Sequence, residues 1–169
     1  HGRLPAAQFL LARAPHLPDG LFASPGQHGL SITTIENATD GVLASADVAL
    51  LASGTVTVQA ALAECPMVVV YRLSSLTYRL GRPFVRVNTF AMANLVAGEE
   101  VVPELMQDDF TPEAVARHAV DILEDPRRAE AMRAGLKMVK AKLGTPGASR
   151  RAAAAVMAVA ARKRPQRLG

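Results

Sequence analysis

The sequence predicts an α/β fold: a Rossmann-like parallel sheet flanked by helices, followed by a helical C-terminal segment. Two observations lead to this class. The predicted strands are short unbroken apolar runs, of which residues 67–71 form the strongest, and predicted helices separate them. Apolar runs of this kind, alternating with helices, are typical of a parallel sheet covered on both faces. In addition, the last third of the chain contains three consecutive helix-start signals.

The first half of the chain supplies most of the predicted sheet. Residues 31–35 are rich in β-branched side chains, and residues 48–52 are a continuous apolar run. In chain order we expect a helix at 4–14, strands at 21–23 and 31–35, a short helix at 39–45, a strand at 48–52, a helix at 57–63 and a strand at 67–71.

The second half is predicted to be mainly helical, after a short helix at 76–80 and a strand at 84–87. The pairs Thr111-Pro112, Asp125-Pro126 and Thr145-Pro146 each place an N-cap residue before a proline at the first helical position. They predict helices at about 111–123, 126–142 and 146–162. The last of these is nearly all alanine, with an apolar face suited to close packing.

Composition limits the class of protein. With 169 residues, half of them apolar, the chain can bury a core and is not a disordered polymer. No apolar run approaches the roughly 18 residues that a membrane-spanning helix needs. The single cysteine, Cys65, excludes an internal disulfide and favours a reducing compartment. The four histidines lack ligand spacing, so we expect neither a metal site nor a cofactor.

Charge is distributed unevenly. Residues 131–169 carry ten basic and no acidic side chains, whereas the remainder carries nine basic and fifteen acidic ones. We therefore divide the chain into a domain at 1–145 and a basic C-terminal helix and tail at 146–169. The basic segment suits an anionic membrane surface, and a solvated helix face is the equal alternative. No nucleic-acid-binding motif accompanies the charge, so we expect no nucleic-acid partner.

Residues 53–59 connect an apolar run to an alanine-rich run and are the first candidate binding segment. The expected structure is a strand, a tight turn of small residues and a helix start. Gly54 permits close backbone approach, while Ser53 and Thr55 offer hydroxyls. Such a turn can direct N–H groups at a phosphate on the helix's N-terminal dipole. A plain packing turn is the alternative, because neither a Walker loop nor Gly-x-Gly-x-x-Gly is present.

Two further segments carry candidate residues. Residues 71–86 interleave arginines, Arg72 among them, with apolar side chains, a pattern that suits an anionic amphiphile or a solvated surface helix. Residues 93–107 are expected to form an apolar loop region with polar residues at intervals. In it, Asn94 and Gln107 can both donate and accept hydrogen bonds, as sugar and uracil recognition requires, or Asn94 can cap a turn.

Taken in order, these segments resemble the lipid-A-disaccharide synthase family, glycosyltransferase family 19. The resemblance is dense over residues 46–125 and loose outside them. The matching stretches are 46–55, 66–72, 76–78, 94–98, 101–107 and the helix start at 111–113.

This resemblance implies the C-terminal, donor-binding half of a GT-B fold, two Rossmann-like halves with a cleft between them. The implied reaction transfers 2,3-diacylglucosamine from UDP to 2,3-diacylglucosamine 1-phosphate with inversion, giving a β-1,6-linked disaccharide and UDP, without a metal. The implied substrate-binding residues are Ser53, Gly54, Thr55, Gln59, Tyr71, Arg72, Asn94 and Gln107.

This sequence departs from the family pattern at two of these places. Gln59 stands where the family usually has a glutamate that grips the ribose, and a neutral acceptor forms a weaker bond than a charged one. Ala93 stands where the family usually has proline, before Asn94. No catalytic residue is assigned, because the general base is expected in an N-terminal domain.

The chain begins at His1 and contains no Pro-Gly-Ser-Arg turn, so we expect a piece of a larger protein, inactive alone. The resemblance implies a bacterial cytoplasmic enzyme peripherally associated with the inner membrane, and possibly a homodimer. Another UDP-sugar GT-B enzyme, such as a UDP-N-acetylglucosamine 2-epimerase or a peptidoglycan glycosyltransferase, is one alternative. A non-catalytic remnant that docks on membranes is the other.

Overall fold

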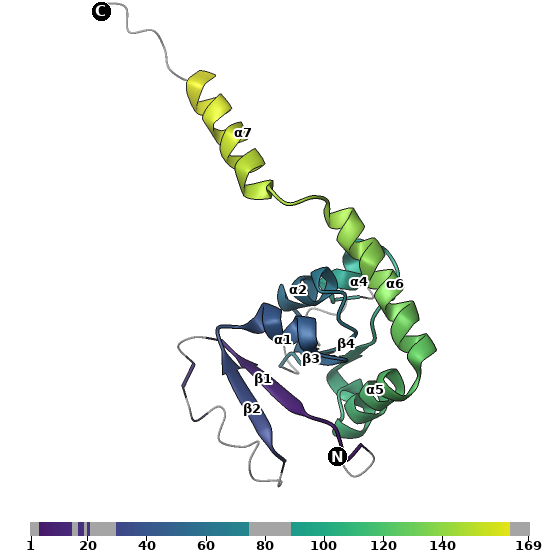
Figure 1. The fold of residues 1–169 in the computed structure, drawn as a ribbon. Helices are drawn as coiled ribbons and strands as arrows, with labels where there is room; N and C mark the ends of the chain where they lie inside the picture. The colour runs from purple at the N-terminus through teal and green to yellow at the C-terminus, as the bar shows by residue number, and fades with distance from the viewer. Residues whose placement is uncertain (1–3, 15–16, 19, 21–29, 75–88, 163–169) are drawn as a thin grey trace, which may run out of the picture.

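The computed structural model describes residues 4–14, 17–18, 20, 30–74 and 89–162. Figure 1 shows a body of short strands and helices from which the last helix projects. The elements are β1 (Phe9–Arg13), β2 (Ile32–Glu36), α1 (Thr39–Ser45), β3 (Ala49–Ala52), α2 (Val56–Leu62), β4 (Met67–Tyr71), α4 (Met92–Ala97), β5 (Glu104–Met106), the 3-10 helix η3 (Gln107–Asp109), α5 (Pro112–Glu124), α6 (Pro126–Leu143) and α7 (Ala148–Arg162).

All strand pairs among the described residues are parallel, which confirms the predicted α/β class. The strands form two small sheets, one of β1 and β2 and one in the order β3-β4-β5. In the second sheet Ala49 lies opposite Met67, and Val69 lies opposite Glu104. Helix α1 lies between β2 and β3, α2 between β3 and β4, and α4 between β4 and β5 in chain order, and parallel strands need crossover connections of this kind.

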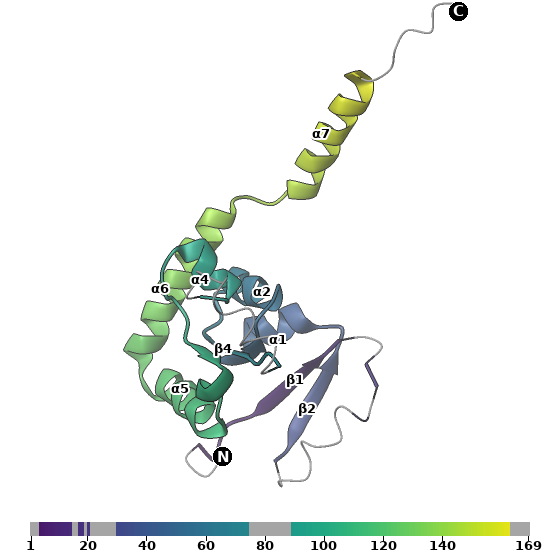
Figure 2. The same ribbon diagram turned by 180° about the vertical axis from the view of Figure 1, so that it is seen from behind.

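The core lies around the central strand β4. Met67, Val68 and Val69 are at most 1% exposed. Helices α2, α4 and α6 pack on one another over this strand, as both ribbon views show (Figures 1 and 2). From α6, Leu136 and Val139 are completely buried. This cluster fixes the sheet whose edge carries the candidate site.

The predicted helix at 4–14 is wrong, because its described part contains the strand β1. Leucine and alanine favour helix, but the segment from Phe9 to Arg13 pairs along its whole length with β2. The Arg13 guanidinium also contacts the Glu36 carboxylate at 3.2 Å across the two strands. Tertiary pairing therefore overrides local propensity here.

The loop predicted for residues 93–107 is also wrong, because α4 and β5 lie within it. Gly98 ends α4 in a left-handed conformation with φ 79°, and its N–H donates to the Asn94 carbonyl. The three-residue strand β5 then joins the edge of β4. A strand of three residues is too short for an alternation of polar and apolar side chains to reveal it.

Several elements are confirmed close to their predicted bounds: β2, α1, β3, α2, β4, α5 and α6. The strand predicted at 21–23, the helix at 76–80 and the strand at 84–87 lie outside the described residues.

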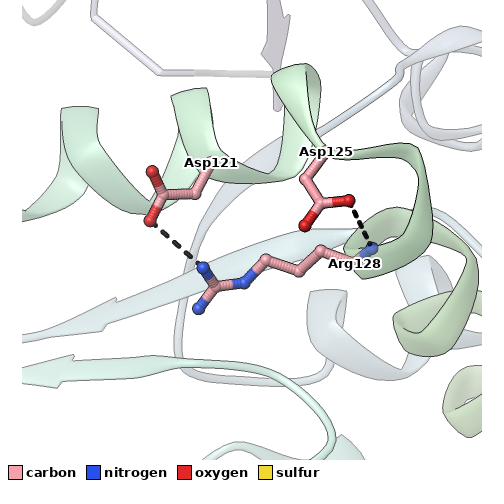
Figure 3. A network of polar contacts seen from close by, with 3 residues as sticks. All are labelled: Asp121, Asp125 and Arg128. Carbon is pink, nitrogen blue, oxygen red and sulfur yellow. Dashed lines mark hydrogen bonds and ion pairs between the residues drawn. The ribbon is translucent and has the colours of Figure 1, made fainter.

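The corner between α5 and α6 confirms two predicted caps. The Thr111 side chain accepts a hydrogen bond from the Ala114 N–H at the start of α5. Asp125 accepts from the N–H groups of Arg127 and Arg128 at 2.9 and 3.3 Å. The Arg128 guanidinium reaches back to Asp121 on α5 at 3.1 Å (Figure 3). These contacts hold the turn between the two helices.

The cap predicted at Thr145 is wrong, and so is the close packing predicted for the last helix. Helix α7 begins at Ala148, after Gly147 in a left-handed conformation with φ 103°. It extends away from the body in both views (Figures 1 and 2). Its apolar side chains are exposed, with Val156 and Met157 at 67% and 70%. The Arg151 guanidinium donates to the carbonyls of Thr145 and Pro146, just before the helix.

Candidate functional site

The carboxyl ends of β3, β4 and β5 carry most of the predicted site residues. The turn 53–55 follows β3, Tyr71 and Arg72 stand at the end of β4, and Gln107 follows β5. Since the three strands are parallel neighbours, these ends lie along one edge of the sheet. Crevices outside the carboxyl ends of parallel strands are where open α/β sheets bind ligands.

The turn 53–55 has the backbone conformation expected of a glycine turn. Gly54 adopts φ 156°, which side-chain-bearing residues rarely adopt, and a Cβ there would meet no heavy atom within 4 Å. Open space therefore lies on the side of Gly54 where a Cβ would be. Among the described residues, the Gly54 and Thr55 N–H groups have no backbone hydrogen-bond partner. The exposed Thr55 side chain forms no capping bond to α2, so its hydroxyl is available to a ligand.

Ser53 and Thr57 support this turn from within. The Ser53 hydroxyl donates to the Phe90 carbonyl at 2.9 Å, and its N–H donates to the Val70 carbonyl. The fully buried Thr57 hydroxyl donates to the Gly54 carbonyl at 2.8 Å. The turn is thus tied to β4, to the segment before α4 and to its own helix.

Gln59 lies on the exposed side of α2 and faces α1. Its side-chain nitrogen lies 3.5 Å from an Asp40 carboxylate oxygen, at the outer limit of a hydrogen bond. Asp40 is in the first turn of α1, which follows β2. The predicted ribose acceptor therefore has a carboxylate beside it. Sequence analysis missed Asp40 because nothing local pairs it with a residue nineteen positions away.

Arg72 and Gln107 lock the end of β4 to the turn after β5. The Gln107 side-chain oxygen accepts from the Leu73 N–H at 2.7 Å, and its nitrogen donates to the Leu73 carbonyl at 3.4 Å. The Arg72 guanidinium donates to the Phe110 carbonyl at 2.8 Å and lies 5.1 Å from that ring's centre. Gln107 itself holds φ 50°, an uncommon conformation for glutamine. Tyr71, at the last position of β4, is half-buried and pairs with Met106.

Asn94 lies inside the protein, 1% exposed, on α4. Its oxygen accepts from the N–H groups of Val101 and Val102, and its nitrogen donates to the Val102 carbonyl and to Glu104. These four bonds use its whole hydrogen-bonding capacity. In this structure the Asn94 side chain fixes the loop before β5, and its direct contact with a ligand stays a prediction.

Glu104, the first residue of β5, is a second polar residue that the sequence analysis did not select. One carboxylate oxygen accepts from Asn94 and the other accepts from the Phe90 N–H, each at 2.7 Å. A signal existed in the sequence: a lone acid directly after Pro103 and before an apolar pair. This signal did not indicate a partner for the acid, because β5 was not predicted.

Other chemically notable features lie away from this edge. Burial raises the pKa of the Cys65 thiol to about 11, and Cys65 precedes β4 at the opposite end of the strand. A hollow of about 530 Å³ between α5, α6 and the loop 99–103 contains none of the predicted site residues.

Among the described residues, no three His, Cys, Asp or Glu side chains gather as a metal site would require. In the same part of the chain, no helix combines the length and apolar character needed to cross a bilayer.

Comparisons with known proteins agree with the resemblance. A family described as lipid-A-disaccharide synthetase matches residues 22–159. The chain is similar to the lipid-A-disaccharide synthases of Geobacter sulfurreducens (44% identical over 92% of this chain and 41% of the relative) and Anaeromyxobacter sp. (40% over 92% and 41%). That of Solibacter usitatus is 45% identical over 76% of this chain and 34% of the relative. The chain thus spans about two fifths of the length of the first two relatives.

Proposed function

Because the chain belongs to the lipid-A-disaccharide synthetase family, we propose that it is the donor-binding part of a glycosyltransferase. Its ligand is the diphosphate of a UDP-sugar, held at the carboxyl edge of β3, β4 and β5. One observation carries the proposal: at this edge the glycine turn 53–55 has two N–H groups without a backbone partner among the described residues and an exposed Thr55 hydroxyl that forms no capping bond. Preorganised donors of this kind stabilise a departing diphosphate.

Each predicted residue has a place in the proposal. The Gly54 and Thr55 amides and the Thr55 hydroxyl bind the diphosphate, and Ser53 anchors the turn. Gln59, with Asp40 beside it, accepts hydrogen bonds from the ribose hydroxyls. Tyr71 and Arg72 lie at the carboxyl end of β4, beside the proposed donor site. The Arg72 guanidinium supplies positive charge there. Asn94 and Gln107 fix the loops that surround the donor. Direct contact with the donor sugar or the diphosphate is proposed for both, and for Asn94 this contact requires one of its four present bonds to break.

For the whole protein we propose the transfer of 2,3-diacylglucosamine from UDP to 2,3-diacylglucosamine 1-phosphate. The acceptor hydroxyl displaces UDP at the anomeric carbon with inversion, and a general base outside this chain removes the hydroxyl proton. The contribution of this chain is to hold the donor and to stabilise the leaving group. Alone, it is expected to bind UDP without catalysing transfer.

Calorimetric titration with UDP, UMP and uridine tests the diphosphate site. UDP is expected to bind more tightly than UMP, because only UDP carries the second phosphate. Thr55→Ala should weaken UDP binding roughly ten- to hundredfold, since a hydrogen bond to a charged group contributes about 1.5–3 kcal/mol. Gly41→Ala is a control outside the turn, because a Cβ at that position meets no heavy atom within 4 Å.

Two results would overturn the diphosphate site. One is the absence of UDP binding at millimolar concentration. The other is equal affinity for UDP and uridine, because the phosphates would then contribute nothing. A Thr55→Ala variant with unchanged UDP affinity would remove that hydroxyl from the site.

We further propose that α7 docks on an anionic membrane surface at the cytoplasmic side of the inner membrane. The helix exposes Val156, Met157 and Val159 at 67%, 70% and 59%, and the segment carries no acidic residue. Sedimentation with anionic vesicles tests this, and binding should fall with added salt and after removal of residues 150–169. Binding unchanged by either treatment would exclude α7 as the anchor.

A homodimer is proposed as well, and sedimentation velocity tests it.

A further inference from the structure

One carboxylate joins three segments near the sheet edge. Glu104, at the start of β5, accepts from the Phe90 N–H before α4 and from the Asn94 side chain within α4. Both bonds are 2.7 Å long, which is short for an N–H donor. Charge-assisted hydrogen bonds are shorter and about twice as strong as neutral ones. Glu104 therefore fixes the position of the backbone at Phe90.

The Asn94 side of this network is rigid. Asn94 is 1% exposed and bonds to three backbone groups of Val101 and Val102 besides Glu104. Its amide cannot rotate without breaking several of these bonds. One oxygen of the Glu104 carboxylate is thus held by the fixed Asn94 amide, and the other accepts from the Phe90 N–H.

The Phe90 side of the network leads to the glycine turn. The Phe90 carbonyl accepts the Ser53 hydroxyl at 2.9 Å. Ser53 directly precedes Gly54 and Thr55, and its own N–H is bonded to Val70 on β4. The turn is therefore tied on one side to β4 and on the other, through Phe90, to Glu104. A movement of Phe90 would be transmitted to the turn through a single hydrogen bond.

We propose that Glu104 is a positioning residue for the diphosphate-binding turn 53–55, which it controls through Phe90 and Ser53. The inference rests on the proposed function, since the turn is the proposed diphosphate site. Glu104 acts from behind the turn and does not touch the donor, because a carboxylate repels phosphate. Its negative charge is useful here because two N–H donors face it from different elements.

Glu104→Gln is the appropriate variant, because it keeps the size of the side chain. The Phe90 N–H and the Asn94 side chain bond different oxygens of Glu104, and a glutamine has an oxygen at only one of these positions, so one of the two donors would face its NH2 group. In amide NMR spectra of the full chain, we expect the Phe90, Gly54 and Thr55 signals to shift. The dissociation constant for UDP should rise about three- to tenfold. The matched control is Glu64→Gln, which removes a carboxylate bonded to Lys140 on α6.

Stability must be measured beside affinity. Both variants are expected to lower the urea midpoint, but only Glu104→Gln should change UDP affinity under conditions where the protein is fully folded. A lower midpoint with unchanged UDP affinity and unchanged Gly54 and Thr55 signals would overturn the inference, because Glu104 would then act only on stability. If the wild-type chain fails to bind UDP, the proposed function fails. The Gly54 and Thr55 signals of Glu104→Gln then decide whether Glu104 controls the turn.

Discussion

Helices α6 and α7 are consecutive in the chain and carry apolar side chains, yet only α6 is packed. Leu136 and Val139 of α6 are completely buried over the sheet, whereas Val156 and Met157 of α7 are 67% and 70% exposed. Local sequence signals predicted both helices. An apolar helix face therefore becomes part of the core only where the fold places another element against it, as α2 and α4 pack against α6.

The largest expected effect is on the free energy of unfolding, when one apolar side chain is truncated in each of the two helices. Leu136→Ala removes a fully buried side chain and should lower the free energy of unfolding by about 2–5 kcal/mol. Met157→Ala removes a similar apolar volume from an exposed position and should change it by no more than about 0.5 kcal/mol. Urea denaturation of both variants measures the comparison. A large loss in Met157→Ala would mean that α7 is buried against a partner in solution.

A second, smaller effect compares the helix caps. Asp125→Ala should cost about 1 kcal/mol, because the Asp125 carboxylate accepts from two backbone N–H groups at the start of α6. Thr145→Ala should be nearly neutral, because α7 begins only at Ala148. The urea denaturation midpoints of the two variants measure these two losses of stability. Equal losses would show that Thr145 caps α7 after all.

The smallest effect concerns the ion pair that ties α6 to the end of α2. The hydrogen bond from Lys140 and its positive charge lower the pKa of Glu64 below 4.5. Because the folded-state pKa is depressed, the pair stabilises the protein above the unfolded pKa, and this contribution is lost as pH falls through the folded pKa. Glu64→Gln should therefore be less stable than wild type at pH 7, and the difference should vanish in acid.

The Lys140→Gln variant is the control for this ion pair. It removes the group that lowers the pKa of Glu64, so a second change at Glu64 should have little further effect at pH 7. A difference between wild type and Glu64→Gln that persists undiminished in acid would contradict the assignment.

Sequence patterns predicted the parallel α/β class and the glycine turn, because each depends on contiguous residues. Unbroken apolar runs marked β3 and β4, and Gly54 marked the turn. Thr111 and Asp125 were predicted as caps because their partners lie within three residues. These features need no knowledge of what lies across the fold.

The features that were missed depend on residues distant in the chain. The segment from Phe9 to Arg13 forms a strand because β2 pairs with it, against the helical preference of leucine and alanine. The bonds that hold Asn94 to the loop before β5 join residues seven and eight positions apart, so no local pattern indicates them. Glu104 acquires its partners only when α4 and β5 come together.

We propose that the turn 53–55 binds the diphosphate of a UDP-sugar, and an amide NMR titration of the chain with UDP tests this proposal most directly. We expect the largest shifts on Gly54 and Thr55, smaller ones near Leu73, and none in α7. Shifts concentrated in α7, or no shift at the turn at millimolar UDP, would contradict it.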